Sequence, residues 1–328
     1  MSFTRESLCR FVLVACASAC AGAQAGAPPA PAATNREPAT TCLVADTSAS
    51  PADTLHYVAD GRPPSVTVAA VDCNGNPAPA IPAADLPVIE YDELPPGTDL
   101  RDVLDRGIPG AGAARADLVF TRDPGVLAYA ARRDDYRAVA LPWDRTYALV
   151  VPNADSTAPP DSVEREALAR DAVRSDARGA AGPFWWQGDT TCNLPAPGAA
   201  ALPVVGFAAG DSIGRELAER IVALATSPGR PAWIPPELGA SRRGPLRTAP
   251  MAADSLGEAI ASGRVAAAVL AYPRIRPPGC DAARRTPAGA ATIPLIDSRA
   301  HVLIRRGSGA AFYIVTDGSI RVMPSERR

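Results

Sequence analysis

Short apolar segments alternate with helical patterns along most of this chain of 328 residues. Apolar and β-branched residues predict strands over residues 65–71, 86–91, 116–120, 202–208 and 265–272. The clearest helical pattern follows Asp211, where Ile213, Leu217, Ile221 and Leu224 form one apolar stripe. Such alternation is typical of an α/β protein, and we expect its sheets to be mainly parallel.

The predicted strands and helices fall into two series, which are separated by a polar stretch at residues 152–162. A charged helix is predicted over residues 163–178, closed by Gly179. Extended segments at 293–304 and 311–322 follow the second series and are free to return to the first. We therefore expect two lobes joined by crossing strands, with residues 42–150 plus 293–328 in lobe 1 and residues 151–292 in lobe 2.

The N-terminus has the pattern of a secretory signal. Arg5 and Arg10 precede an apolar run at residues 11–19, and small residues then lead to Cys20. A small-residue run that ends in cysteine resembles the lipobox of bacterial lipoproteins, which predicts a signal peptide over residues 1–20 and lipidation of Cys20, or of Cys16. Ordinary cleavage after residue 23 or 25 is the alternative. Residues 21–41 predict a disordered spacer, and the location implied is the periplasm or cell envelope, with a lipid anchor in the membrane.

The four cysteines beyond the signal are an even set, which in an oxidising compartment predicts disulfides. Three pairings are possible. We expect Cys42–Cys73 and Cys192–Cys280, because each pair then stays within one lobe.

Composition excludes several classes of function. The net charge of −2 and the absence of a large basic patch argue against a nucleic-acid partner. With two histidines, no Cys-x-x-Cys and no clustered carboxylates, no metal site and no cofactor are expected.

Three segments resemble type 2 periplasmic solute-binding proteins of ABC importers. They are residues 117–124 with 140–149, residues 204–225, and residues 255–270. The resemblance implies two lobes that close by hinge bending on a small solute. Aromatic residues and arginine near the expected cleft would suit a peptide, an organic anion or a sugar. It also implies a possible ABC permease as partner, and we expect a monomer without catalytic activity.

Ligands of open α/β sheets collect at the carboxyl ends of strands and near helix N-termini. This rule selects candidate ligand-binding residues after three predicted strands and at the crossing between the lobes: Thr121, Arg122, Asp123, Trp143, Asp211, Ser212, Tyr272 and Arg274. For Asp123 a helix N-cap is the competing interpretation. Beside Trp143, the corresponding interpretation is that Asp144 and Arg145 form an ion pair with each other.

Two other functions remain open. The segment Gly210-Asp211-Ser212-Ile213-Gly214 has the spacing of a nucleophile elbow, and His301 with Asp297 lies downstream, so an envelope serine hydrolase using Ser212 and His301 is one alternative. A binding fold that now serves as an envelope interaction module, without a solute, is the other.

Overall fold

The computed structural model describes residues 41–43, 54–61, 63–68, 88–112, 114–152, 159–172, 176–187, 193–195, 202–239, 244–277, 279–280, 286–308, 311–315 and 319–323. The signal and lipidation predictions lie outside these residues, as does the spacer apart from Thr41. The described chain forms three sheets, and in each of them both strand orientations occur, so the expectation of mainly parallel sheets is wrong. The fold is mixed α/β.

A five-stranded sheet has the order β4-β2-β5-β13-β6. Its strands are β2 (Thr54–Ala59), β4 (Val88–Tyr91), β5 (Leu118–Thr121), β6 (Tyr136–Ala140) and β13 (His301–Arg305). Alternate residues of β5 enter different cores, because side chains of a strand point to opposite faces. Val119 packs with the helices α1 (Leu100–Arg106) and α2 (Pro124–Ala130), whereas Leu118 and Phe120 pack with the four-stranded sheet.

That four-stranded sheet joins segments from both ends of the described chain, in the order β1-β14-β15-β3. Its strands are β1 (Thr41–Leu43), β3 (Val66–Val68), β14 (Ala311–Ile314) and β15 (Ile320–Met323). Phe312, Ile320 and Val322 are fully buried against the five-stranded sheet. The five-stranded sheet is therefore covered by helices on one face and by a second sheet on the other.

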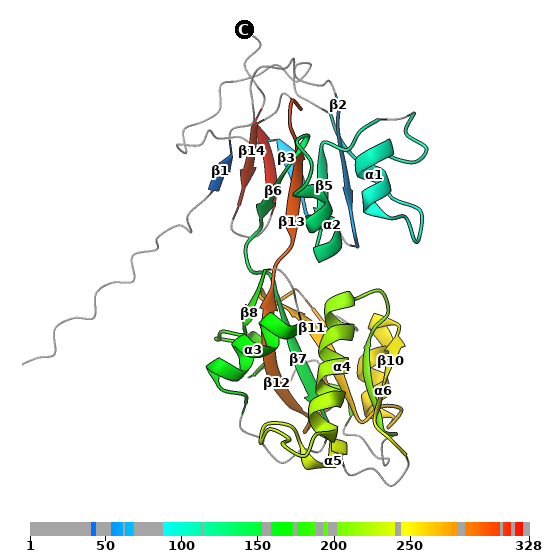
Figure 1. Cartoon of the computed structure of the whole chain (residues 1–328), viewed down its shortest axis with the longest axis vertical. Coiled ribbons are helices and arrows are strands. Elements are labelled where there is room, and N and C mark those ends of the chain that lie inside the picture. Colours follow the sequence, from blue (N-terminus) through cyan, green and yellow to red (C-terminus); the bar gives the residue numbers. More distant parts are fainter. Residues whose placement is uncertain are drawn as a thin grey trace, which may run out of the picture. The chain divides into compact units, whose positions relative to one another are not determined.

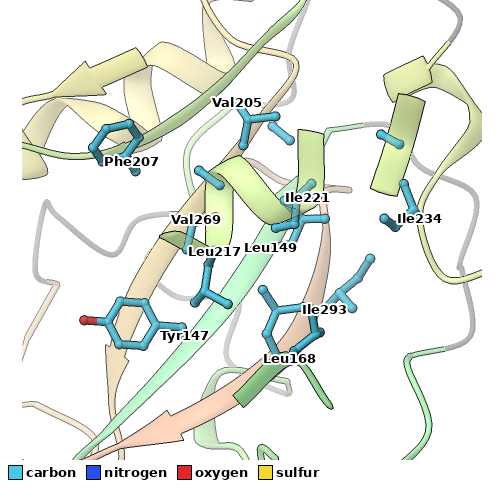
Figure 2. Close-up of a cluster of buried hydrophobic side chains, with 14 of the residues drawn as sticks. Tyr147, Leu149, Leu168, Val205, Phe207, Leu217, Ile221, Ile234, Val269 and Ile293 are labelled. Atoms are coloured by element: carbon cyan, nitrogen blue, oxygen red, sulfur yellow. The ribbon is translucent and has the colours of Figure 1, made fainter. Parts of the chain in front are cut away.

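A six-stranded sheet has the order β10-β9-β11-β7-β12-β8. Its strands are β7 (Arg145–Val151), β8 (Ala177–Gly179), β9 (Val204–Ala208), β10 (Arg247–Met251), β11 (Ala267–Pro273) and β12 (Ala291–Ser298). Figure 1 shows α4 (Ser212–Thr226) lying along one face of this sheet, and the core beneath it holds Tyr147 and Leu149 of β7 (Figure 2). The alternate residues of β7, Ala148 and Val150, pack on the opposite face of the sheet with α6 (Leu256–Ala261).

The helix α4 forms as its sequence predicts. Asp211 caps it, since its carboxylate accepts a hydrogen bond from the Gly214 N–H at 2.9 Å. Ile213, Leu217 and Ile221 are buried on the sheet, and Leu224 is packed at the edge of the same core. The predicted stripe is confirmed. The short α5 (Pro236–Gly239) contacts α4.

Two predicted segments differ from the structure. Residues 163–178 do not form one helix, because α3 (Ser162–Ala172) ends earlier and Arg178 lies in β8, paired with Asp297 of β12. Residues 293–304 are not one strand either. Arg299 and Ala300 divide them, so that β12 pairs in the six-stranded sheet and β13 pairs with β5 in the five-stranded sheet.

Helices able to cross a membrane were sought in the described residues, and none of those helices is long and apolar enough. Cys280 is disulfide-bonded. Cys73 and Cys192 lie outside the described residues, so both predicted pairings stay predictions.

Leu217 provides a test of the α4 core. Truncation of this fully buried side chain to alanine is expected to lower the free energy of unfolding by about 3 kcal/mol, because it removes buried apolar surface and leaves a cavity. Urea unfolding measures the change. Glu216→Ala, at an exposed position of the same helix, is the matched control and should stay within about 0.5 kcal/mol of the wild type. Equal losses in the two variants would contradict the assigned face of α4.

Candidate functional site

The chain passes between the five-stranded and six-stranded sheets through two short links. One link joins β6 to β7 through residues 141–144, and the other joins β12 to β13 through Arg299 and Ala300. Arg145, where β7 begins, pairs with Ser298 at the end of β12 and with Pro273 at the end of β11. His301, where β13 begins, pairs with Thr121 at the end of β5. Antiparallel pairing thus gathers both links and the carboxyl ends of three strands.

Polar and charged side chains are concentrated at these strand ends. We call this group the polar junction; its members are Thr121, Arg122, Asp144, Arg145, Ser298, Arg299 and His301. Thr121 and Ser298 are fully buried, and His301 is 6% exposed. Burial of so many polar groups is costly unless each finds a partner.

On the β5 side, the local order is set by Asp60, which directly follows β2. Its carboxylate accepts hydrogen bonds from the Thr121 hydroxyl at 2.5 Å and from the Arg122 N–H at 3.0 Å. Burial of this carboxyl group raises the pKa of Asp60, and the two hydrogen bonds oppose that change. Asp123 caps α2 by accepting from the Gly125 N–H at 2.7 Å, which confirms the N-cap interpretation.

Arg122 is ion-paired with Asp144, which lies just before β7. The predicted pairing of Asp144 with Arg145 is therefore wrong. The two residues are adjacent, and β7 turns Arg145 toward the side of Tyr147, because residues two apart in a strand share a face.

Arg145 lies near the N-terminus of α4. The Tyr147 hydroxyl donates to both carboxylate oxygens of Asp211 at 3.0 Å. Burial lowers the pKa of Arg145, but Tyr147, Asp211 and Asp144 together raise it above its ordinary value. For Tyr147 the effect of burial is the opposite: it raises the pKa of the phenol, and Asp211 raises it further. At neutral pH this corner therefore holds a charged guanidinium and a neutral phenol, and Ser212 is exposed at the first turn of α4.

The opposite face of the six-stranded sheet carries a second charged group, centred on Asp297, which is 0% exposed. Its carboxylate accepts from the Thr146 hydroxyl at 2.6 Å, from Arg274 Nη1 at 3.1 Å, from Arg178 Nε at 3.2 Å and from the Ala181 N–H at 3.3 Å. Every oxygen of this carboxylate is satisfied. We interpret the Asp297 group as structural, since it ties the ends of β7, β8, β11 and β12 together.

Trp143 lies in the link between β6 and β7, as the predicted crossing implied, and Tyr272 lies in β11. The Trp143 ring has the guanidinium groups of Arg178 and Arg299 each 4.6 Å from its centroid, an arrangement that holds both cations close to the links. Tyr272 is 1% exposed and stacks on Trp186, with ring centroids 4.5 Å apart. It therefore packs in the core beside α6, apart from the polar junction.

His301 contacts Asp176 through Nε2, and Arg299 Nη2 donates to the same carboxylate at 2.6 Å. Burial alone would raise the pKa of Asp176, but Arg299 and His301 lower it, so this carboxylate is ionised and Nε2 of His301 is the donor. Burial lowers the pKa of His301 from its ordinary value of 6.5, with Asp176 opposing the change.

The polar junction also holds most of the unsatisfied polar atoms. Within the described part of the chain, eight buried side-chain nitrogen or oxygen atoms have no hydrogen-bond partner, and five of them belong to the junction. These five are Arg122 Nη1, Asp144 Oδ1, Ser298 Oγ, Arg299 Nε and His301 Nδ1. Such atoms are rare in folded proteins, and ordered water or a bound molecule can supply the missing hydrogen bonds.

The sequence did not single out Asp60, Ser298 or Arg299. Asp60 follows a strand that the sequence pattern did not predict. Ser298 and Arg299 lie within the segment taken as one strand; the run of polar residues inside it was the available signal. Of the candidate residues, the structure brings Thr121, Arg122 and Trp143 together at the links, and places Asp211 with Ser212 beside Arg145. It places Arg274 on the opposite face.

Among the described residues, no group of three or more histidine, cysteine, aspartate or glutamate side chains is arranged to hold a metal ion. The chemistry available at the polar junction is that of guanidinium, imidazole, hydroxyl and carboxylate groups. It suits hydrogen bonding and charge recognition.

Comparison with known proteins identified no matching family model and no matching curated protein. Among solved structures, the chain is similar to HinK, a LysR family transcriptional regulator from Pseudomonas aeruginosa, with 12% identity and a TM-score of 0.30 over 79% of this chain and 66% of that one. The match thus spans just under two thirds of the regulator. Two structures of a phosphate-binding protein from Stenotrophomonas maltophilia match with 13% identity and a TM-score of 0.28, over 74% of this chain and 79% of theirs. TM-scores this low support no argument about function, so the function is inferred below only from the residues of the site.

Asp297 is expected to be essential for stability. Asp297→Asn leaves Arg274 and Arg178 without their shared counter-charge, and we expect the free energy of unfolding to fall by about 3 kcal/mol. Asp171→Asn, which breaks the exposed ion pair with Arg220, is the control and should cost less than about 1 kcal/mol. Urea unfolding distinguishes the two; a small loss in Asp297→Asn would refute its structural role.

The lowered pKa of His301 predicts that the stability of the fold depends on pH. Because its pKa is lower in the folded chain than the ordinary 6.5, the unfolded chain binds more protons below that pH, and stability falls as pH drops through 6.5. The free energy of unfolding, measured between about pH 5 and pH 8, should therefore depend less on pH in His301→Gln than in the wild type. His56→Gln is the control. Identical pH profiles for wild type and His301→Gln would show that His301 does not contribute.

Proposed function

We propose that this protein binds a small anionic solute at the polar junction and performs no catalysis. The observation that carries the proposal is the cluster of buried, unpartnered polar atoms at the two links, above all Arg122 Nη1 and Arg299 Nε. Both are guanidinium N–H donors, which recognise carboxylate, sulfate and phosphate oxygens well. An anion that accepts from them satisfies groups that the chain leaves without partners.

The guanidinium group of Arg145 supports an anion over a sugar or a neutral peptide. Arg145 forms no ion pair with any carboxylate of the described residues, and its pKa is raised, so it keeps its charge. Ser212 and the N-terminal turn of α4 lie beside Asp211, which faces Arg145 and Tyr147. Asp211 already caps the helix, so the guanidinium groups, and not the helix end alone, supply the attraction.

The proposal extends to the setting in which the solute is captured. A two-lobed chain with a signal and a lipid anchor would present the site outside the cytoplasm, where capture can supply an ABC importer by closure about the two links. The serine hydrolase alternative is not favoured, because among the described residues no hydrogen bond joins Ser212 to His301, and His301 Nε2 is engaged by Asp176 instead.

Calorimetric titration of the mature domain tests the proposal, with inorganic phosphate, sulfate and succinate as anions and glucose as a neutral comparison. We expect at least one anion to bind and glucose not to bind. Arg122→Gln should raise the Kd for that anion at least about tenfold, because a hydrogen bond to a charged group contributes roughly 1.5–3 kcal/mol.

Arg220→Gln is the matched control, since it removes an equal charge from an exposed position on α4. It should leave the Kd unchanged. Binding of glucose alone, or equal affinity in wild type and Arg122→Gln, would contradict an anion site at the polar junction.

A further inference from the structure

The contact between Arg122 and Asp144 uses one terminal nitrogen of the guanidinium and one oxygen of the carboxylate. Nη2 of Arg122 meets Oδ2 of Asp144, while Nη1 and Oδ1 are buried and have no partner. Arginine and carboxylate commonly pair through two parallel hydrogen bonds, which would satisfy all four atoms. The Asp297 carboxylate, by contrast, accepts hydrogen bonds on both oxygens. Asp144 is therefore an imperfect partner for Arg122.

The backbone around Asp144 is held in place. Its carbonyl oxygen accepts a hydrogen bond from the Arg274 N–H at 2.7 Å. The next residue, Arg145, is paired in the sheet with Pro273 and with Ser298. The Asp144 side chain is 40% exposed, so its carboxylate can rotate into solvent while the strand stays where it is.

Arg122 is fixed more firmly. Its N–H donates to Asp60 at 3.0 Å, and its side chain is only 18% exposed. If Asp144 leaves, the guanidinium remains at the junction without its ion-pair partner, and Asp60 is the carboxylate left near it. The loss of that pair is unfavourable for a group with so little contact with water. A second anion in the same place would remove that cost.

We propose that Asp144 is an internal competitor for the solute, occupying Arg122 until an anion displaces it. This inference rests on the proposed function and adds a rule for which anions the site prefers. An anion that offers two oxygens to Nη1 and Nη2 gains a hydrogen bond over Asp144, whereas a monatomic anion only replaces the one contact that it breaks. The site should therefore select polyatomic oxyanions over chloride.

Asp144→Asn tests the competition, because it preserves the shape of the side chain and removes its charge. With inorganic phosphate, sulfate and succinate as probes, we expect the Kd of the anion that binds to fall about fivefold relative to wild type, since a partly exposed ion pair contributes up to about 1 kcal/mol. Asp171→Asn is the matched control: Asp171 is 46% exposed and is paired with an arginine, Arg220, on α4. It should leave the Kd unchanged, and circular dichroism confirms that both variants are folded.

Each outcome decides the matter. Tighter binding in Asp144→Asn but not in Asp171→Asn, or binding that appears only in Asp144→Asn, supports the competitor. Unchanged affinity in Asp144→Asn shows that Asp144 does not compete, and weaker binding shows that it contacts the solute; both overturn the inference and leave the proposed function standing. Absence of binding in both wild type and Asp144→Asn overturns the inference together with the proposed function.

Discussion

The antiparallel pairing of β7 with β12 is the constraint on which the site depends. It places the two links between the five-stranded and six-stranded sheets next to each other, since Arg145 and Ser298 are register partners. The pairing of His301 with Thr121 continues the arrangement in the five-stranded sheet. Residues that are far apart in the chain, such as Arg122 and Arg299, thereby become members of one polar group whose backbone is fixed by sheet hydrogen bonds.

Two charged groups at these strand ends differ in how fully they are satisfied. Asp297 accepts hydrogen bonds from four residues and is wholly buried, which is the behaviour of a structural anchor. Arg122, which follows β5, and Asp144, in the link before β7, share a single contact and leave two buried atoms without partners. Natural proteins rarely leave such atoms unsatisfied without a functional reason. The saturated group holds the strand ends still, and the unsaturated group has donors to offer to a solute.

The sequence predicted those parts of the fold that local patterns determine. The α4 stripe and the cap at Asp123 follow from helical spacing and side-chain chemistry, and both are present. Strand direction and the division of residues 293–304 depend on pairing with distant strands, which no local pattern encodes. The position of Asp144 shows the same limit within the site. Its neighbour in sequence, Arg145, was the obvious partner, but strand geometry turned that side chain away and brought in Arg122, which directly follows β5.

A crystal structure of the protein, grown with the oxyanion that binds most tightly in titration, tests the central claim most directly. The account predicts the anion within hydrogen-bond distance of Arg122 Nη1, roughly 2.7–3.2 Å, with the Asp144 carboxylate rotated away. An anion bound elsewhere, with Asp144 still in contact with Arg122, would contradict it.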